Sequence, residues 1–223
     1  MNPELFLKFA TDHQTISSQH EIPERSLEHI LFDGGDLNKR LRDKALEPED
    51  CLRIFRELMF ALGDIHEQGV LHRDLKPQNL MFRADGSLAI LDFGIAKHID
   101  AIDRTGHGEI LGTPRYMSPE QVRGVALDLR TDIYSAGVLL YQMLTGRHLF
   151  DGETAVEVAL HHLNTQPPDL PENLLAYQRL IDKLVEKDRD ARFRNADEVI
   201  GFLSRKYYQG TGAFGAEKTT KLL

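Results

Sequence analysis

The sequence contains one cysteine and no tryptophan among its 223 residues. A lone cysteine excludes an internal disulfide and a metal site of paired thiolates, and it favours a reducing compartment. The longest apolar stretch, residues 136–141, is far shorter than the roughly 20 residues that span a bilayer. The opening letters, MNPELFLKFATDHQ, turn polar too early for a secretion signal. These absences predict a soluble, cytoplasmic protein with no membrane span.

An excess of positive charge is also lacking. The chain has 27 Lys and Arg against 35 Asp and Glu, which gives a formal net charge of −8. Because phosphate-rich surfaces reward positive patches, this balance argues against a general nucleic-acid or anionic-membrane binder. The content of 41% hydrophobic and 28% charged residues is ordinary for a globular protein. The length is sufficient for one domain with a well-packed core.

Apolar spacing predicts a mainly helical chain with a few short strands. Apolar residues recur every three or four positions over 52–65, which predicts a helix that begins near Glu47 and ends at Gly69. Residues 132–144 are apolar on nearly all sides and predict a buried central helix. Two short apolar stretches within 80–91, separated by a turn, predict a hairpin. Further predicted segments are a helix from Asn2, a strand at 27–32, a loop at 100–112, and helices at 154–163, 171–186 and 196–207.

Three short motifs follow one another along the chain. Residues 72–79 read HRDLKPQN, with an aspartate and an asparagine five positions apart. Thirteen residues after that asparagine, residues 92–94 read DFG. Residues 118–120 read SPE and follow GTPRY at 112–116. Each motif alone is a weak signal. Their order, with a hairpin, a loop and a buried helix in the gaps, makes coincidence a poor explanation.

In this order the motifs resemble those of eukaryotic-type (Hanks-type) serine/threonine protein kinases, over about residues 27–207. A lysine two positions after the aspartate is similar to the serine/threonine members rather than the tyrosine kinases. The phrasing around GTPRYMSPEQ is most similar to bacterial members. The resemblance implies an α+β protein-kinase-like fold. Its mainly α-helical C-lobe would carry a short β-hairpin at the cleft.

The residue types suit the reaction that the resemblance implies. Phosphoryl transfer requires aligned partners and neutralised charge more than covalent work by the protein. Asp74 can accept a hydrogen bond from an incoming hydroxyl and take its proton. Lys76 can offset negative charge on the transferring group. Asn79 and Asp92 offer oxygen ligands to Mg²⁺, a hard cation that prefers carboxylate, amide and water oxygens.

Nucleotide-binding roles come from the resemblance alone. Thr113 matches the family threonine that contacts the catalytic aspartate and lysine. Ile30 and Phe32 fall in the expected adenine hinge, and Met81 in the neighbouring strand, so these three residues are assigned to nucleotide binding. The cofactors implied are ATP and Mg²⁺.

A regulatory contact is also implied. Arg73 matches a family residue in a basic pocket that can pair with a phosphorylated loop residue and order the segment. Thr105, eight residues before Thr113, is the expected acceptor. The alternative left open is that Thr105 is merely solvated.

Other matches are expected to be structural. Asp132 matches the family aspartate that hydrogen-bonds the backbone of the catalytic loop. Glu120 and Arg192 match its buried ion pair, which ties the activation segment to a later helix. His72 matches a core residue rather than a base. The remaining histidines, His162 among them, are expected to be surface or core residues and not ligands.

The beginning of the chain departs from the family pattern. A complete kinase starts with a glycine-rich loop and a strand lysine paired with a helix glutamate. No Gly-x-Gly-x-x-Gly occurs before the hinge, and Lys8, in a predicted helix, is the only lysine before Lys39. The N-lobe is therefore expected to be truncated. Residues 1–32 are assigned to its remnant, 33–207 to the kinase C-lobe, and 208–223 to a flexible tail.

Two functions and one reconciling arrangement follow. The first function is a serine/threonine protein kinase, with Met117 and residues 113–119 lining the groove for a protein substrate. The second is a truncated kinase or pseudokinase that acts as a non-catalytic interaction module. They would be reconciled if the reading frame as given starts too late, or if a separate N-lobe or regulatory chain is the partner. Weak or no ATP turnover is expected of the isolated chain, because an open site exposes the nucleotide to water.

Overall fold

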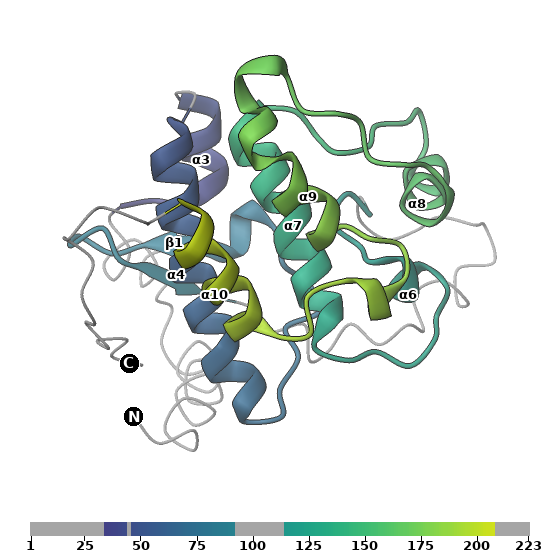
Figure 1. Cartoon of the computed structure of the whole chain (residues 1–223), viewed down its shortest axis with the longest axis horizontal. Helices are drawn as coiled ribbons and strands as arrows, with labels where there is room; N and C mark the ends of the chain where they lie inside the picture. The colour runs from purple at the N-terminus through teal and green to yellow at the C-terminus, as the bar shows by residue number, and fades with distance from the viewer. Residues whose placement is uncertain (1–33, 44–45, 92–113, 208–223) are drawn as a thin grey trace, which may run out of the picture.

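The structure, a computed structural model, describes residues 34–43, 46–91 and 114–207 (Figure 1). Within these ranges the chain is mainly helical and contains one two-stranded antiparallel sheet. This agrees with the expected mixture of helices and a single hairpin. The segments assigned to an N-lobe remnant and a tail lie outside the described residues, as do the predicted helix from Asn2, the strand at 27–32 and the loop at 100–112. No described helix has both the length and the apolar character needed to cross a membrane.

Helix α4 spans Pro48–Glu67, close to the predicted bounds. It begins with proline in the first turn and has two acids, Glu49 and Asp50, at the positive end of the helix dipole. It ends where Gly69 adopts φ +74° and donates its N–H to the carbonyl of His66 at 2.9 Å. The buried stripe of this helix consists of Cys51, Leu52, Ile54, Phe55, Leu58, Met59, Leu62 and Ile65.

Helix α7 spans Arg130–Thr145 and is the buried central helix that the sequence predicts. Gly137 allows helix α9 (Gln178–Leu184) to pack closely, because an added Cβ at this glycine would lie 2.6 Å from the Cβ of Leu184. Gly146, in the left-handed conformation, ends α7. This central helix is therefore a rigid support for the segments that surround it.

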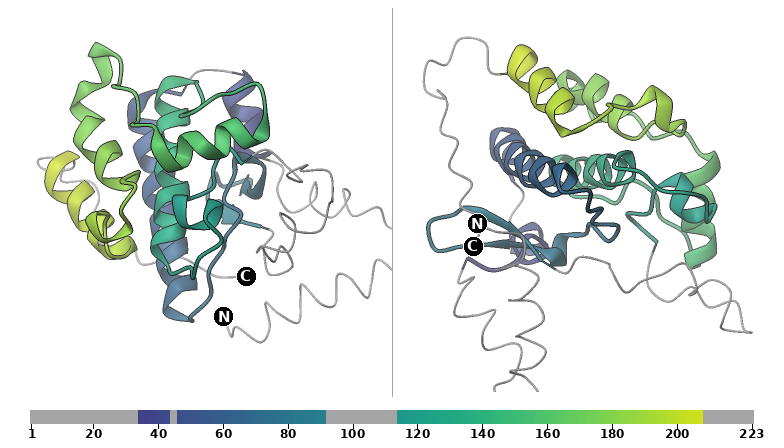
Figure 2. Two further views of the ribbon diagram at one scale, coloured as in Figure 1. Left: turned by 90° about the vertical axis from the view of Figure 1, so that its right-hand side faces the viewer. Right: turned by 90° about the horizontal axis from the view of Figure 1, so that it is seen from below.

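The elements form layers around α4 and α7. These two helices pack side by side, with α10 (Ala196–Tyr207) against α4 and α9 against α7. The hairpin of β1 (Leu80–Phe82) and β2 (Leu88–Ile90) lies on the opposite side of α4 from α10 (Figure 2). Leu80 pairs with Ile90 and Phe82 with Leu88, as the predicted turn between the strands requires. The hairpin prediction is confirmed.

The sequence did not predict all the elements. The structure adds α3 (Leu37–Asp43), α6 (Pro119–Val122), η1 (Pro77–Asn79) and η3 (Arg189–Ala191), and it divides the predicted helix at 171–186 into η2 (Glu172–Tyr177) and α9. These added elements are all seven residues or shorter, so apolar periodicity has too few repeats to reveal them. The longer helices α8 (Ala155–Asn164) and α10 occur as predicted.

Residues 34–36 lie alongside β1. The N–H of Gly34 donates to the carbonyl of Phe82 at 3.2 Å, and the Phe82 N–H donates to the carbonyl of Gly35 at 2.9 Å. Asp36 forms an isolated bridge with Met81. A Cβ on Gly34 would lie 2.8 Å from Phe82, so the close approach depends on glycine. The start of the described chain is thereby fixed against the strand that follows the HRDLKPQN motif.

Candidate functional site

The motif HRDLKPQN forms the loop between α4 and β1. His72 and Leu75 are buried, and the His72 Nε2 lies 3.0 Å from the carbonyl oxygen of Leu91. Pro77 begins the single-turn helix η1, a position that suits its fixed φ and missing N–H. His72 is therefore part of the core, as predicted, and the loop is anchored on both sides of Arg73 and Asp74.

Asp132 of α7 is the main polar anchor of this loop. Its fully buried carboxylate accepts hydrogen bonds from the backbone N–H of His72 at 2.9 Å and of Arg73 at 2.8 Å. His66, in the last turn of α4, places its Nε2 2.8 Å from the same carboxylate. One buried carboxylate thus joins α7, the loop and the end of α4. The predicted role of Asp132 is confirmed.

Asp74, Lys76 and Asn79 converge at the centre of the loop. The Lys76 ammonium donates to Asp74 Oδ2 at 2.8 Å. The Asn79 Nδ2 donates to the backbone carbonyl of Asp74 at 2.9 Å and approaches its Oδ2 at 3.5 Å. The side chains of Asp74 and Lys76 are 28% and 30% exposed, so both can reach a ligand. The arrangement presents a fixed, accessible carboxylate beside a positive charge.

The predicted metal and nucleotide residues are only partly within the described chain. Both hydrogen bonds of the Asn79 side chain there use its Nδ2, which leaves its amide oxygen for a cation. This fits the oxygen ligands that Mg²⁺ prefers. Met81 is half-buried on β1 beside Asp36, next to the loop. Asp92, Ile30 and Phe32 lie outside the described residues, where their predicted roles stay predictions. Among the described residues, no group of three or more His, Cys, Asp or Glu side chains is arranged so that it could hold a metal ion.

Arg73 has an unusual backbone. Its φ of +68° makes it the one non-glycine residue with positive φ among those described. Left-handed residues with a Cβ are strained and persist only where their surroundings fix them, and they cluster at functional sites. The Arg73 side chain is exposed. Thr105 and Thr113, the predicted regulatory and catalytic threonines, lie outside the described residues, so their contacts remain predictions.

Residues 114–118 are held against helix α7 by hydrogen bonds. The hydroxyl of Ser135 donates to the carbonyl of Tyr116 at 2.7 Å, and the Tyr116 hydroxyl donates to the Gln142 side chain at 2.6 Å. Burial raises the pKa of Tyr116 to about 12, so its hydroxyl stays protonated. Met117, a predicted groove residue, is half-buried within this segment. The segment that precedes α6 is thus held in one conformation.

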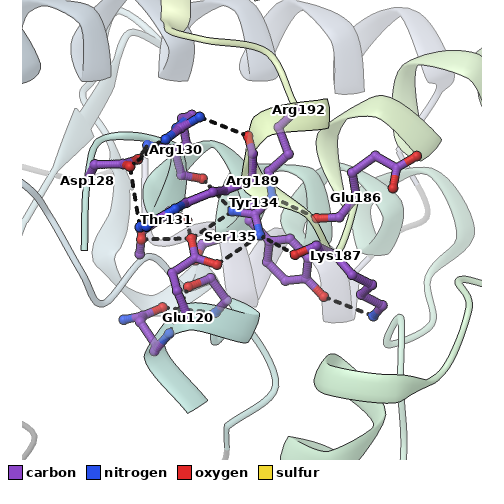
Figure 3. A network of polar contacts seen from close by, with 12 residues as sticks. Glu120, Asp128, Arg130, Thr131, Tyr134, Ser135, Glu186, Lys187, Arg189 and Arg192 are labelled. Carbon is purple, nitrogen blue, oxygen red and sulfur yellow. Dashed lines mark hydrogen bonds and ion pairs between the residues drawn. The ribbon is translucent and has the colours of Figure 1, made fainter. Parts of the chain in front are cut away.

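Glu120 and Arg192 form a buried, two-pronged ion pair (Figure 3). The two Arg192 Nη atoms lie 2.7 and 2.8 Å from the two oxygens of Glu120. Thr131 donates to Glu120 at 2.9 Å, and the carbonyl of Glu186 accepts from the Arg192 Nε at 2.7 Å. Burial pushes the pKa of Glu120 up, but the hydrogen bonds and charge of Arg192 outweigh it and leave the pKa lowered. The predicted ion pair is confirmed.

Sequence reasoning missed two polar contacts of the site. His66, which contacts Asp132, stands among apolar positions near the end of α4, and that position was its only signal. Gln121 completes a capping box with Ser118, and its Nε2 also reaches the carbonyl of Arg73. The Ser-x-x-Gln spacing before α6 is a helix-start signature that could have revealed the cap.

A buried titratable cluster lies behind residues 114–118. The hydroxyl of Tyr134 lies 2.9 Å from His162 Nδ1, and His162 Nε2 lies 3.1 Å from the carbonyl of Arg115. Lys187 approaches the Tyr134 hydroxyl at 3.5 Å and lies over the ring of Phe150. Burial, then the charge of Lys187, lowers the pKa of His162 to about 3. His162 is therefore a neutral core residue, consistent with the expectation that it is not a ligand.

This cluster predicts a pH-dependent stability. The unfolded chain takes up a proton on His162 below its ordinary pKa of 6.5, whereas the folded chain does not until about pH 3. The contribution of this group to stability is thus complete above pH 6.5. It falls on acidification with a slope of up to about 1.4 kcal/mol per pH unit. A His162→Asn variant should lack this slope in urea unfolding measured between about pH 7.5 and 5, a range set by these pKa values.

The neighbouring His161 supplies the control for that experiment. Its side chain is 33% exposed. A His161→Asn variant should keep the pH dependence of the unsubstituted protein. Parallel curves for the unsubstituted protein and the His162→Asn variant would contradict a buried neutral histidine.

The sequence of this chain is similar to those of several known proteins. The family description "Protein kinase domain" matches residues 11–201. The protein named serine/threonine-protein kinases drp72 of Corynebacterium efficiens is 40% identical over 164 residues, which cover 73% of this chain and 32% of that relative. Serine/threonine-protein kinases PknA of Corynebacterium glutamicum is 39% identical over 217 residues, which cover 89% of this chain and 46% of that relative. PrkC of Bacillus subtilis, a serine/threonine-protein kinase, is 32% identical over 197 residues, which cover 84% of this chain and 30% of that relative. The chain therefore spans between 30% and 46% of the length of these three relatives.

Proposed function

Because this chain belongs to the protein kinase family, we propose that it carries the catalytic centre of a serine/threonine protein kinase. The reaction transfers the γ-phosphoryl group of ATP to a serine or threonine hydroxyl of a protein. The similarity to relatives named serine/threonine-protein kinases supports this choice of acceptor. We also propose that the reaction, with ATP as cosubstrate, takes place in the cytoplasm, in line with the sequence-based prediction.

The arrangement of Asp74, Lys76 and Asn79 is the observation that carries the proposal. Asp74 is the group that would accept the proton of the acceptor hydroxyl, and Asn79 holds its backbone carbonyl at 2.9 Å. Lys76, 2.8 Å from Asp74, places a positive charge where negative charge gathers during transfer. A partly exposed carboxylate with fixed orientation suits a base that must meet a protein substrate.

The nucleotide and metal sites are a second part of the proposal. Mg²⁺, when bound, would neutralise phosphate charge and orient the phosphates. Asn79 would contribute its amide oxygen, and Asp92 a carboxylate. Met81, with Ile30 and Phe32, would contact the adenine ring. Support within the described chain comes from the available oxygen of Asn79 and from the position of Met81 beside the loop.

The acceptor side and its regulation complete the proposal. Residues 114–118, held by Ser135 and Gln142, would form part of the groove for the substrate peptide. Thr113 would contact Asp74 and Lys76. The exposed side chain of Arg73 would pair with a phosphate on Thr105 and so favour the ordered segment.

Phosphoryl transfer can be tested directly. The chain is incubated with γ-labelled ATP, Mg²⁺ and unstructured peptides that contain serine, threonine or tyrosine. We expect slow labelling, because the open site exposes the nucleotide to water, and label on serine and threonine only. Removal of Mg²⁺ with EDTA should abolish transfer, because the phosphate charge is then uncompensated. Label on tyrosine, or transfer that is independent of Mg²⁺, would contradict the proposal.

Nucleotide binding distinguishes the alternative function. The same chain is titrated with Mg-ATP by calorimetry. A chain that neither binds Mg-ATP nor transfers phosphate would favour the non-catalytic interaction module. A chain that binds Mg-ATP tightly excludes a pure scaffold.

A further inference from the structure

Gln121 connects two parts of the molecule that lie 48 positions apart in sequence. It is the third residue of α6, directly after the segment at 114–118. Its Oε1 accepts the backbone N–H of Ser118 at 2.9 Å, and the Ser118 hydroxyl accepts the Gln121 N–H at 3.2 Å. These two bonds are the capping box that starts the helix. They fix the side chain of Gln121 in one direction.

The other end of the same amide reaches the catalytic loop. The Nε2 of Gln121 donates to the carbonyl of Arg73 at 2.7 Å. On the other side of Arg73, its N–H donates to Asp132 at 2.8 Å. Both peptide groups that flank the Cα of Arg73 are therefore held from outside the loop, one by α6 and the other by α7. The peptide group held by Gln121 is the one that joins Arg73 to Asp74.

Arg73 needs this restraint because its φ of +68° is strained for a residue with a Cβ. The fixed end, Asp132, is fully buried in the central helix. The Gln121 end is half-buried and belongs to the part of the chain that forms the acceptor side. The strained conformation before Asp74 thus depends on the order of residues 114–122 as well as on the core.

We propose that Gln121 is a positioning residue that couples the order of the acceptor-side segment to the orientation of Asp74, through the Arg73 carbonyl. The kinetic consequence rests on the proposed phosphoryl transfer, whereas the structural consequence, a less ordered loop without this bond, does not. Gln121 acts through the backbone and does not touch the reacting atoms.

A single isosteric change separates this bond from the cap. In a Gln121→Glu variant one carboxylate oxygen still accepts the N–H of Ser118, because glutamate suits this position of a capping box as well as glutamine. The second oxygen faces the Arg73 carbonyl and has no hydrogen to donate. We expect backbone amide hydrogen exchange in residues 72–79 to accelerate by about 10-fold, as expected for losing one such bond. At saturating substrate, kcat should fall by about 10-fold with KM for the peptide little changed.

Gln178 provides a matched control. Its Oε1 accepts the N–H of Leu170 at 2.6 Å and its Nε2 donates to Asp182 at 2.7 Å, so it combines the same two roles with partners outside the catalytic loop. A Gln178→Glu variant undergoes the same chemical change and should lower the melting temperature. It should leave kcat and the exchange of residues 72–79 as they are in the unsubstituted protein.

A pH profile adds a readout that a purely structural role would not move. In the Gln121→Glu variant, protonation of the introduced carboxyl supplies an O–H donor for the Arg73 carbonyl. The ratio of variant kcat to unsubstituted kcat should therefore rise as the pH is lowered from about 8 to about 5.5, toward the ordinary range of a glutamate. The Gln178→Glu ratio should stay flat.

Hydrogen exchange tests the coupling by itself, whereas the kinetics also test the proposed function. If unsubstituted protein transfers no phosphate, the proposed function fails, and the exchange of residues 72–79 alone decides the present inference. Unchanged exchange in the Gln121→Glu variant would overturn the coupling, whatever the activity. Faster exchange in that variant but not in Gln178→Glu supports it, and so does a fall in kcat that low pH reverses.

Discussion

Replacing Asp74 by asparagine is expected to slow phosphoryl transfer by about 100- to 10,000-fold, the range that a positioned general base contributes. Asparagine is nearly isosteric, but its amide cannot take the proton of the acceptor hydroxyl. It also presents a dipole where Lys76 now contacts a carboxylate at 2.8 Å. The initial rate at saturating Mg-ATP and peptide measures the effect.

Stability should change little in the Asp74→Asn variant. The pair with Lys76 is more than a quarter exposed on both sides, and pairs of this kind contribute about 0–1 kcal/mol. An equal melting temperature would therefore assign the lost rate to chemistry and not to unfolding. A fall in stability as large as the fall in transition-state stabilisation would contradict that assignment.

A turn residue of the hairpin gives the matched control. Asp85 lies in the tip between β1 and β2, and its carboxylate accepts the backbone N–H of Ser87 at 2.9 Å. Asparagine suits this turn position. An Asp85→Asn variant should keep the full transfer rate. If Asp74→Asn also keeps its rate within about three-fold, far less than a general base contributes, the proposed role of Asp74 is wrong.

Replacing Arg192 by methionine is expected to lower the free energy of unfolding by about 3–5 kcal/mol. The Arg192 side chain is fully buried and that of Glu120 is 4% exposed. Removal of the guanidinium would leave the carboxylate buried without its partner. It would also leave the carbonyls of Glu186 and Arg130 without the donors they now have at 2.7 and 3.0 Å. Urea unfolding at neutral pH measures the loss.

A neighbouring arginine separates burial from charge in this experiment. Arg194 lies two positions further on, is 84% exposed, and pairs with Glu198 at 3.4 Å. Exposed pairs contribute about 0–1 kcal/mol, so an Arg194→Met variant should unfold close to the unsubstituted protein. Equal losses in the two variants would show that the buried geometry contributes nothing.

The double variant Glu120→Gln with Arg192→Met tests the cause. If the penalty arises from an unpaired buried charge, neutralising Glu120 should recover part of the stability lost in Arg192→Met. A double variant as unstable as the sum of the two single variants would indicate independent contributions. In that case the ion pair would not be the cause of the loss.

Several features of the fold could be predicted because they depend on local rules. The bounds of α4 follow from its proline, its acids and the glycine at 69, and the buried α7 follows from its continuous apolar run. The hairpin follows from two apolar stretches around a turn. The short elements α3 and α6 could not be found in this way, because four to seven residues hold too little periodic signal.

In the candidate site, too, the local features could be predicted from the sequence and the remote contacts could not. The sequence was sufficient to select Asp74, Lys76 and Asn79, because their residue types suit phosphoryl transfer and they share one short loop; their contacts came from the structure. The partners of that loop are remote: Asp132 is 59 positions from Arg73, and Gln121 is 48 positions from it. The resemblance to a family supplied the first partner. No pattern in the sequence supplied the second, because the contact depends on how α6 lies against the loop.

The sequence by itself therefore determined the residue chemistry of this protein: one cysteine, a negative net charge, and an ordered set of motifs that suit phosphoryl transfer. Only the tertiary structure decided how that chemistry is held. It placed Asp132 under two backbone N–H groups, buried Glu120 against Arg192, and brought Gln121 to the strained Arg73. The physical reason is that local spacing fixes which groups a loop carries. The orientation of those groups depends on hydrogen bonds from helices that packing alone brings together.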